Sequence, residues 1–304
     1  MANVLLGARN RILPALITPL TANGELDEKS LEHLIDHLYR SGMGGLYVTG
    51  STGEGIYLDP AIRRRVTEIA VAHSRGHGQV LVHVGAIAAM QAFDLAKHAA
   101  QVGADGVSSI PPFVGKYSPD ETLEYYRTLC AATSLPVVGY YIPSLTGTAF
   151  PINQVLDLLK LETMVGIKYT HTDLYVLERV MSHAGREKIV YFGVDEMLCH
   201  GVACGAHGGI GTTYNFMPKL ILEVATLCAE GRWDEARKVQ KKVNEIIEIL
   251  LSFHGLAATK QILVWQGHIA AAKCAPPRAM LSVEQQENLR SRLMQTAIAD
   301  TLVR

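Results

Sequence analysis

Short apolar segments alternate along the chain with longer amphipathic segments. The short segments are rich in Val, Ile and Tyr, as in buried β-strands, and the longer ones repeat apolar residues at helical spacing. Eight strands are predicted, at residues 12–17, 46–49, 80–84, 106–110, 137–142, 165–169, 189–192 and 208–211. This alternation is typical of βα units around a parallel sheet.

Two of the helical segments carry strong local signals. Ser118, followed by Pro119 and Glu121, has the pattern of a capping box with proline in the first helical position. An earlier helix is predicted from one apolar stripe that can cover a sheet, made of Leu31, Leu34, Ile35 and Leu38.

The number of strand–helix units indicates the fold class. Eight units in about 230 residues match a closed barrel, whereas a doubly wound open sheet usually has fewer strands. Beyond Asn215 the predicted strands stop and only helical patterns follow, broken near Gly255 and at Pro276 and Pro277. We therefore predict an α/β protein with a (β/α)8 TIM barrel in residues 1–230 and a C-terminal helical extension, packed on the barrel, in residues 231–304. One apolar stripe of this extension comprises Val239, Val243, Ile246 and Leu250.

Composition excludes several partners. The chain has 304 residues, of which 48% are hydrophobic, and a formal net charge of −1, so no overall basic field is available to bind nucleic acid. The short basic run Arg63–Arg65 is interpreted as a solvated helix face.

The same survey favours a cytoplasmic protein without a membrane partner or a metal. Residues 1–11 lack a continuous apolar segment of the signal-peptide kind, and no window offers the ~18 apolar residues of a membrane span. Five cysteines are odd in number and sparse, which argues against a disulfide framework. The Cys and His residues at 199–207 do not match the spacing of a zinc ligand set, so we predict no metal site.

In a barrel, chemistry is expected where strands end and βα loops begin, and the first informative strand end is the turn of residues 50–55. Its glycines permit close backbone approach, and Ser51 and Thr52 supply hydroxyl groups. Converging N–H groups in such a turn can bind a carboxylate, although many turns of this composition bind nothing. The Gly-Lys-Ser/Thr ending of a nucleotide phosphate loop is missing from this turn.

Lys168 ends an apolar strand where polar turn residues are more usual. A lysine beside a barrel core would lose hydration, which favours the neutral amine and frees it to attack a carbonyl. The alternative is a side chain that extends to solvent.

One unit earlier, Tyr140 and Tyr141 must point to opposite faces of their strand, so only one of them can face the lumen. A phenol there could relay protons, although strand tyrosines are more often packing residues.

Acidic and hydroxyl residues follow the last two strands. Asp195 and Glu196 open a helix after Gly193, where they can act as caps or accept hydrogen bonds from a polyhydroxylated substrate. Thr212 follows the glycine-rich strand at residues 208–211 and adds a hydroxyl group.

Taken together, these strand ends resemble the N-acetylneuraminate lyase and dihydrodipicolinate synthase superfamily, in order through nearly the whole chain. The markers are Gly50-Ser51-Thr52-Gly53-Glu54, Tyr140 with Ile142-Pro143, Gly166-Ile167-Lys168 and Gly209-Ile210-Gly211. The resemblance implies a (β/α)8 enzyme that needs no metal or organic cofactor and is usually a homotetramer.

The resemblance also implies a role for each site residue. By position, Lys168 corresponds to the Schiff-base lysine and Tyr140 to the proton-relaying tyrosine. Ser51 and Thr52 correspond to the pair that holds the substrate carboxylate. The residues implied to orient the polyol tail are Thr170, Gly193, Asp195, Glu196 and Thr212.

Two features favour the lyase branch. Leu145 stands where synthases carry an arginine that grips the second substrate's carboxylate, which leucine cannot do. The 193–196 segment and Thr170 fit the lyase pattern. The departures from the family pattern are Tyr141 in place of an asparagine, Thr212 in place of a serine, and Val114 near the place of the synthases' interface tyrosine.

The resemblance implies an enzyme of carbohydrate metabolism, a class I lyase that reversibly cleaves N-acetylneuraminate, a sialic acid, to pyruvate and N-acetylmannosamine. A pyruvate-dependent aldolase or dehydratase for another 2-keto-3-deoxy sugar acid, such as 2-keto-3-deoxygluconate, and dihydrodipicolinate synthase remain as alternatives. A member that binds a keto acid without catalysis is a further alternative, although the presence of both Lys168 and Tyr140 argues against it. The expected partners are a small 2-keto acid and further copies of the chain.

Overall fold

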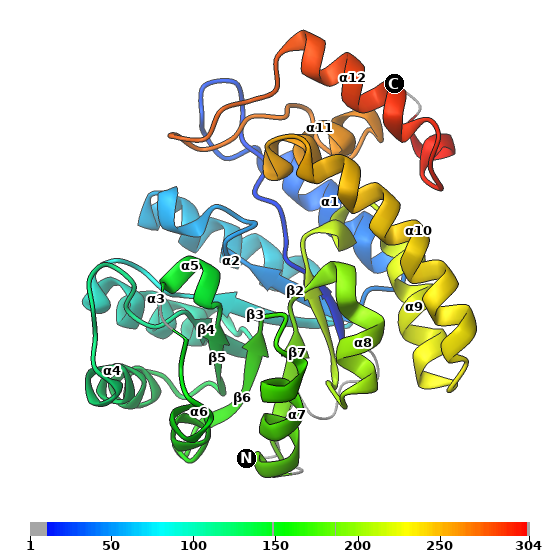
Figure 1. The fold of residues 1–304 in the computed structure, drawn as a ribbon. Coiled ribbons are helices and arrows are strands. Elements are labelled where there is room, and N and C mark those ends of the chain that lie inside the picture. Colours follow the sequence, from blue (N-terminus) through cyan, green and yellow to red (C-terminus); the bar gives the residue numbers. More distant parts are fainter. Residues whose placement is uncertain (1–10, 148, 186, 303–304) are drawn as a thin grey trace.

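The computed structural model describes residues 11–147, 149–185 and 187–302. In this part of the chain, eight parallel strands form the centre of the molecule (Figure 1). The strands are β1 (Ile12–Pro14), β2 (Gly45–Val48), β3 (Gln79–His83), β4 (Gly106–Ser109), β5 (Val137–Tyr141), β6 (Met164–Tyr169), β7 (Ile189–Phe192) and β8 (Gly208–Gly211). All eight predicted strands are therefore present.

The sheet closes on itself. Its hydrogen-bonded order is β1-β8-β7-β6-β5-β4-β3-β2, and an isolated parallel bridge between Ala15 and Tyr47 joins β1 to β2. The predicted first strand, residues 12–17, is longer than β1. Ala15 N still donates to Gly211 O and Leu16 N to Tyr47 O, both at 2.8 Å. Regular pairing ends beyond Pro14 because the side chain of Asn215 bonds Ala15 O at 2.7 Å and Ile17 N at 3.1 Å in place of a strand neighbour. The predicted (β/α)8 barrel is confirmed.

Helices follow the strands and cover the barrel. They are α1 (Glu28–Arg40), α2 (Pro60–Ser74), α3 (Ala89–Val102), α4 (Pro119–Ala132), the short α5 (Pro143–Thr146), α6 (Ile152–Leu159), α7 (Leu174–His183), α8 (Leu198–Ala203) and α9 (Pro218–Ala229), with 3₁₀ turns η1 (Gly55–Tyr57), η2 (Asp195–Met197) and η3 (Thr213–Asn215). The apolar stripe of α1 is buried as predicted, and α4 begins with the predicted capping box of Ser118 and Glu121.

Three more helices follow the barrel. They are α10 (Trp233–Leu251), α11 (Gly255–Trp265) and α12 (Val283–Leu293), followed by the 3₁₀ turn η4 (Ala299–Thr301). Figure 1 shows α10 along α9, with α11 and α12 above the barrel. Ala270 N, just after α11, donates to Ser30 Oγ of α1 at 3.0 Å, so this part of the chain is attached to the barrel wall. The division into a barrel of residues 1–230 and an extension of residues 231–304 stays a prediction.

No single helix in the described ranges is long and apolar enough to cross a membrane. Only α10 and α11 taken together would have sufficient length, and they are bent by 113° at the break between them. Residues 1–10, which enter the signal-peptide prediction, lie outside the described residues.

The interpretation of residues 63–65 as a solvated run is wrong for its first member. Arg64 and Arg65 are exposed, but Arg63 is only 2% exposed, on the inner face of α2 with Val66 and Ala70. Its guanidinium donates to His83 O at 2.8 Å and to Gly85 O at 3.1 Å, past the end of β3. The helical periodicity of α2 turns this one arginine inward because it is spaced three and seven residues from buried apolar positions.

Candidate active site

Lys168 lies in the barrel lumen between two aromatic rings. Tyr140 on β5 and Lys168 on β6 are paired in register, so their side chains leave the sheet on the same face. Lys168 Nζ lies 4.2 Å from the ring centroid of Tyr140 and 4.4 Å from that of Tyr47 on β2. The lysine is 4% exposed, so its side chain does not extend to solvent. Aromatic faces at this distance attract a cation, which suits a nitrogen that becomes positively charged.

The two adjacent tyrosines of β5 point in opposite directions, as predicted. Tyr140 joins the cluster inside the barrel that contains Tyr47 and Tyr191. Tyr141 faces the helices and stacks on Tyr169, with ring centroids 5.1 Å apart. Tyr140 is therefore the tyrosine that can act in the lumen.

His83 at the end of β3 fixes the neighbouring side of the lumen. Its ring meets that of Tyr140 edge to face at 6.0 Å. Ile110 N donates to Nε2 at 3.2 Å, which leaves Nδ1 to donate to Thr49 O, also at 3.2 Å. Burial, assisted by the charges of Arg63 and Lys168, lowers the pKa of His83 to about 3. The imidazole is therefore neutral and serves as a bridge between strand ends.

The turn after β2 has an unusual backbone. Thr49 and Glu54 adopt left-handed conformations, with φ of 56° and 58°, which cost free energy for residues other than glycine. Gly55 is required here, because a Cβ at this position would lie 1.9 Å from Thr49 O. Within the turn Ser51 and Thr52 are half-buried.

Barrel closure brings the two predicted hydroxyl sites together. Thr52 Oγ1 and Thr212 Oγ1, which are 160 positions apart in the chain, form a 2.6 Å hydrogen bond. Thr170 and Gly193 meet at the ends of the neighbouring strands β6 and β7. A Cβ at Gly193 would lie 1.9 Å from Thr170 Oγ1 and 3.1 Å from Lys168 Cε, so only glycine fits beside the lysine. Thr170 Oγ1 is buried and makes no hydrogen bond within the described structure.

Asp195 and Glu196 have different environments. Asp195 is buried, and its Oδ2 accepts hydrogen bonds from the backbone N and the Oγ1 of Thr213, both at 2.8 Å. Burial raises the pKa of Asp195 to about 6, against the effect of these hydrogen bonds. Its Oδ1 lies next to Gly211, and a Cβ added to this glycine would lie only 2.1 Å from that oxygen. Glu196 is exposed on the same turn, η2, and its side chain is not brought into the buried cluster.

Several residues of the site were not singled out from the sequence. Tyr47 could have been found by strand alternation, because it occupies the face opposite to Leu46 and Val48. His83 carried no comparable local signal. Asn215 was used only as the point where strands stop, yet its Oδ1 accepts from Ile17 N at 3.1 Å and its Nδ2 donates to Ala15 O at 2.7 Å. These contacts hold β1 against the end of β8.

No group of three or more His, Cys, Asp or Glu side chains that could hold a metal ion occurs in the described ranges.

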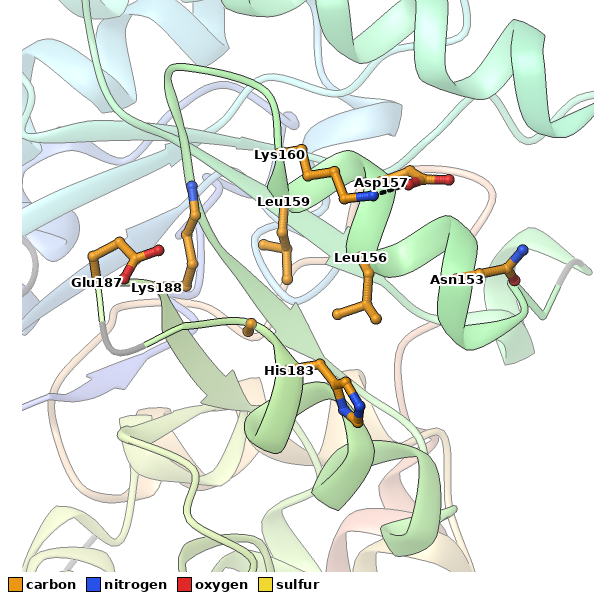
Figure 2. Close-up of a pocket in the computed structure, with 9 residues that line it drawn as sticks. Asn153, Leu156, Asp157, Leu159, Lys160, His183, Glu187 and Lys188 are labelled. Carbon is orange, nitrogen blue, oxygen red and sulfur yellow. Dashed lines mark hydrogen bonds and ion pairs between the residues drawn. The ribbon is translucent and has the colours of Figure 1, made fainter.

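A surface pocket of about 480 Å³ lies away from Lys168, between α6 and α7 (Figure 2). Both of its lysines have partners of their own: Lys160 pairs with Asp157 at 2.7 Å, and Lys188 Nζ donates to Met164 O at 2.7 Å. Because Lys188 immediately precedes β7, this pocket lies at the amino ends of the strands, opposite the residues described above.

Comparison with known proteins agrees with this geometry. Residues 8–296 match the model of the dihydrodipicolinate synthetase family. An N-acetylneuraminate lyase of Rhizobium meliloti is 36% identical over 252 residues, 83% of this chain and 84% of the relative. Together with the fold and the buried lysine, these matches define a (β/α)8 lyase of the aldolase type. The chain belongs to the dihydrodipicolinate synthetase family.

Solved structures support the same assignment. A catalytic lysine mutant of the Ruminococcus gnavus sialic acid aldolase superimposes with a TM-score of 0.92 at 28% identity, covering 99% of this chain and 98% of that one. CdNal of Clostridium difficile in complex with mannosamine gives a TM-score of 0.91 at 29% identity, with coverage of 95% and 99%.

The buried carboxylate makes stability depend on pH. The pKa of Asp195 rises from 3.8 to about 6 on folding, so its protonated form stabilises the fold below pH 4, and this contribution is lost as pH rises through 6. Replacing Asp195 with Asn should therefore raise the free energy of unfolding, relative to wild type, by about 2 kcal/mol more at pH 7 than at pH 4. Denaturant unfolding at both pH values measures this difference.

The control for this prediction is Asp94→Asn, which removes an exposed carboxylate on α3. It should show no comparable change between the two pH values. Equal stability differences at pH 4 and pH 7 for Asp195→Asn would contradict the prediction.

Proposed function

We propose that this lyase cleaves N-acetylneuraminate reversibly to pyruvate and N-acetylmannosamine, with Lys168 as the Schiff-base residue. The observation that carries the proposal is the burial of Lys168 Nζ between the rings of Tyr47 and Tyr140 at the carboxyl ends of the strands. The names of its relatives and the mannosamine complex of a structural neighbour support the choice of substrate.

Lys168 is the nucleophile of the proposed reaction and reacts through its unprotonated amine. It attacks the C2 carbonyl of the open-chain keto acid, and loss of water from the adduct leaves a protonated imine. The aromatic faces of Tyr47 and Tyr140 stabilise this positive charge. The C3–C4 bond then breaks, its electron pair moves toward the iminium, and an enamine results. Because the iminium accepts the electrons, the proposed mechanism needs no metal or organic cofactor.

Tyr140 acts on the proton of the C4 hydroxyl. As that hydroxyl becomes the aldehyde of the departing sugar, its proton is accepted through Tyr140, assisted by the substrate carboxylate on Ser51 and Thr52. Protonation of the enamine at C3 and addition of water to the imine release pyruvate and restore Lys168.

The remaining residues orient the polyol. Thr170 Oγ1 is buried without a partner within the described structure, so a substrate hydroxyl near the imine would satisfy it. Asp195 Oδ1 and Glu196 accept hydrogen bonds from more distant hydroxyls, and Gly193 leaves room beside Lys168. Thr212 is engaged by Thr52 at 2.6 Å, so its hydroxyl must rotate or share that bond to meet the tail.

We further propose a cytoplasmic homotetramer. Val114 and Tyr117 in the loop after β4 and Leu145 in α5 are exposed apolar or aromatic residues, which is the kind of surface that subunit contacts cover.

A panel of keto acids tests the substrate assignment. N-acetylneuraminate should give the highest kcat/KM, with pyruvate and N-acetylmannosamine as products in a coupled assay and by mass spectrometry. Faster cleavage or dehydration of 2-keto-3-deoxygluconate, or condensation of pyruvate with an amino aldehyde, would transfer the assignment to one of the other branches.

Borohydride reduction in the presence of pyruvate tests the lysine chemistry. The reduced adduct should map to the peptide that contains Lys168, and Lys168→Ala should form none. Lys188→Ala, at the opposite end of the barrel, is the matched control and should still be labelled. An adduct on another lysine would overturn the mechanism.

Tyr140→Phe tests the proton relay. Loss of the phenolic hydroxyl should lower kcat by about 10²- to 10⁴-fold, while the melting temperature stays close to that of wild type because the ring remains. Tyr141→Phe is the matched control, since that ring faces the helices, and it should retain most activity. A Tyr140→Phe enzyme with wild-type turnover would remove this residue from the relay.

A further inference from the structure

The turn that carries Ser51 and Thr52 is anchored by a buried ion pair from the C-terminal helices. Glu54 ends this turn, Lys260 lies in α11, and the two are 206 positions apart in the chain. Both side chains are 0% exposed, and Lys260 Nζ donates to Glu54 Oε2. The acidic residue of the turn is therefore directed into the protein, away from the lumen.

Each member of the pair has a second partner. Glu54 Oε1 accepts from Ala275 N at 2.8 Å, and Lys260 Nζ donates to Lys273 O at 2.6 Å. Burial removes the hydration of both charges, and this cost is offset only when the geometry is good and the remaining polar atoms are bonded. Here α11 and the segment 273–275 together satisfy the carboxylate, so they also determine where it lies.

The position of this carboxylate matters because the turn is strained. Glu54 has a φ of 58°, and a non-glycine residue keeps this unfavourable conformation only when its surroundings hold it there. Its N–H donates to Ser51 O at 3.2 Å, and Gly55 N donates to Gly50 O at 3.0 Å. The backbone of residues 50–55 is therefore coupled directly to the conformation of Glu54.

We propose that Glu54 and Lys260 are positioning residues for substrate binding, which hold the Ser51–Thr52 turn in the form that receives the keto-acid carboxylate. This inference rests on the proposed function, because it takes that carboxylate as the ligand of the turn. An apolar pair of similar volume would fill the same space, but it would not supply the directional bonds that fix a strained backbone.

The expected kinetic signature is a change in KM more than in kcat. The substrate carboxylate is held both in the ground state and in the transition state, so weaker holding removes binding energy common to both. Lys168 and Tyr140 lie on β6 and β5, whereas the side-chain hydrogen bonds of Glu54 and Lys260 go to each other and to the backbone of Lys273 and Ala275. Displacement of the turn by about 1 Å should raise the half-saturating pyruvate concentration by about 10- to 100-fold.

The experiment compares Lys260→Met, Glu54→Gln and the double variant in the full-length protein. Pyruvate is titrated while the borohydride-trapped Lys168 adduct is measured by mass spectrometry, and KM, kcat and melting temperature are recorded alongside. Lys260→Met leaves Glu54 buried and unpaired, so it should lose both stability and pyruvate affinity. Lys241→Met, an exposed lysine on α10, is the matched control and should behave as wild type.

The double variant separates positioning from simple stability. It contains no unpaired buried charge, so its melting temperature should recover relative to Lys260→Met, while half-saturation by pyruvate stays raised. If affinity recovers together with stability, or if either single variant keeps wild-type half-saturation, the positioning role is wrong. If wild type itself forms no Lys168 adduct with pyruvate, the proposed function fails first, and this inference fails with it.

Discussion

The short strand β1 joins the two edges of the sheet, and the rest of the structure depends on this closure. On one side β1 pairs with β8, and on the other the bridge between Ala15 and Tyr47 reaches β2. Asn215 bonds to the backbone on both sides of Leu16 and fixes the strand in place. Because the ring is closed, the carboxyl ends of all strands converge, and residues from β2 and β8 meet at one site.

Inside that ring, the polar groups have unequal environments. Lys168 is enclosed by aromatic rings, His83 is held neutral between two strand ends, and Asp195 is buried with its pKa raised to about 6. Thr170 Oγ1 is buried without a partner in the described structure. The hydroxyl of Thr170 and the buried carboxylate of Asp195 cost stability when nothing is bound, and hydroxyl groups of the proposed substrate would bond to them. The site is therefore a place where folding stability and ligand binding are opposed, as is common in enzymes.

Individual strands and helices show where local sequence patterns predict the structure correctly and where they do not. The predicted bounds of β7 and β8 match the structure, because a compact apolar run and a glycine-rich run are each bounded by clear breaks. Residues 12–17 have the pattern of one strand, but only the first half lies in the ladder, since the side chain of Asn215 takes the backbone groups of Ala15 and Ile17. Arg63 was misjudged because it stands in a charged run. Its spacing from Val66 and Ala70 held the correct signal, but an arginine is rarely expected inside.

The sequence by itself determined the alternation of strands and helices, the helix caps, the barrel class, and the candidate residues at the strand ends. These depend on periodicity and on motifs within a few residues. Only the tertiary structure decided that Lys168 is enclosed by Tyr47 and Tyr140, that Thr52 meets Thr212, and that Lys260 reaches Glu54. The physical reason is that such contacts join residues far apart in the chain, and the local sequence does not specify which distant side chain satisfies a buried charge or hydroxyl.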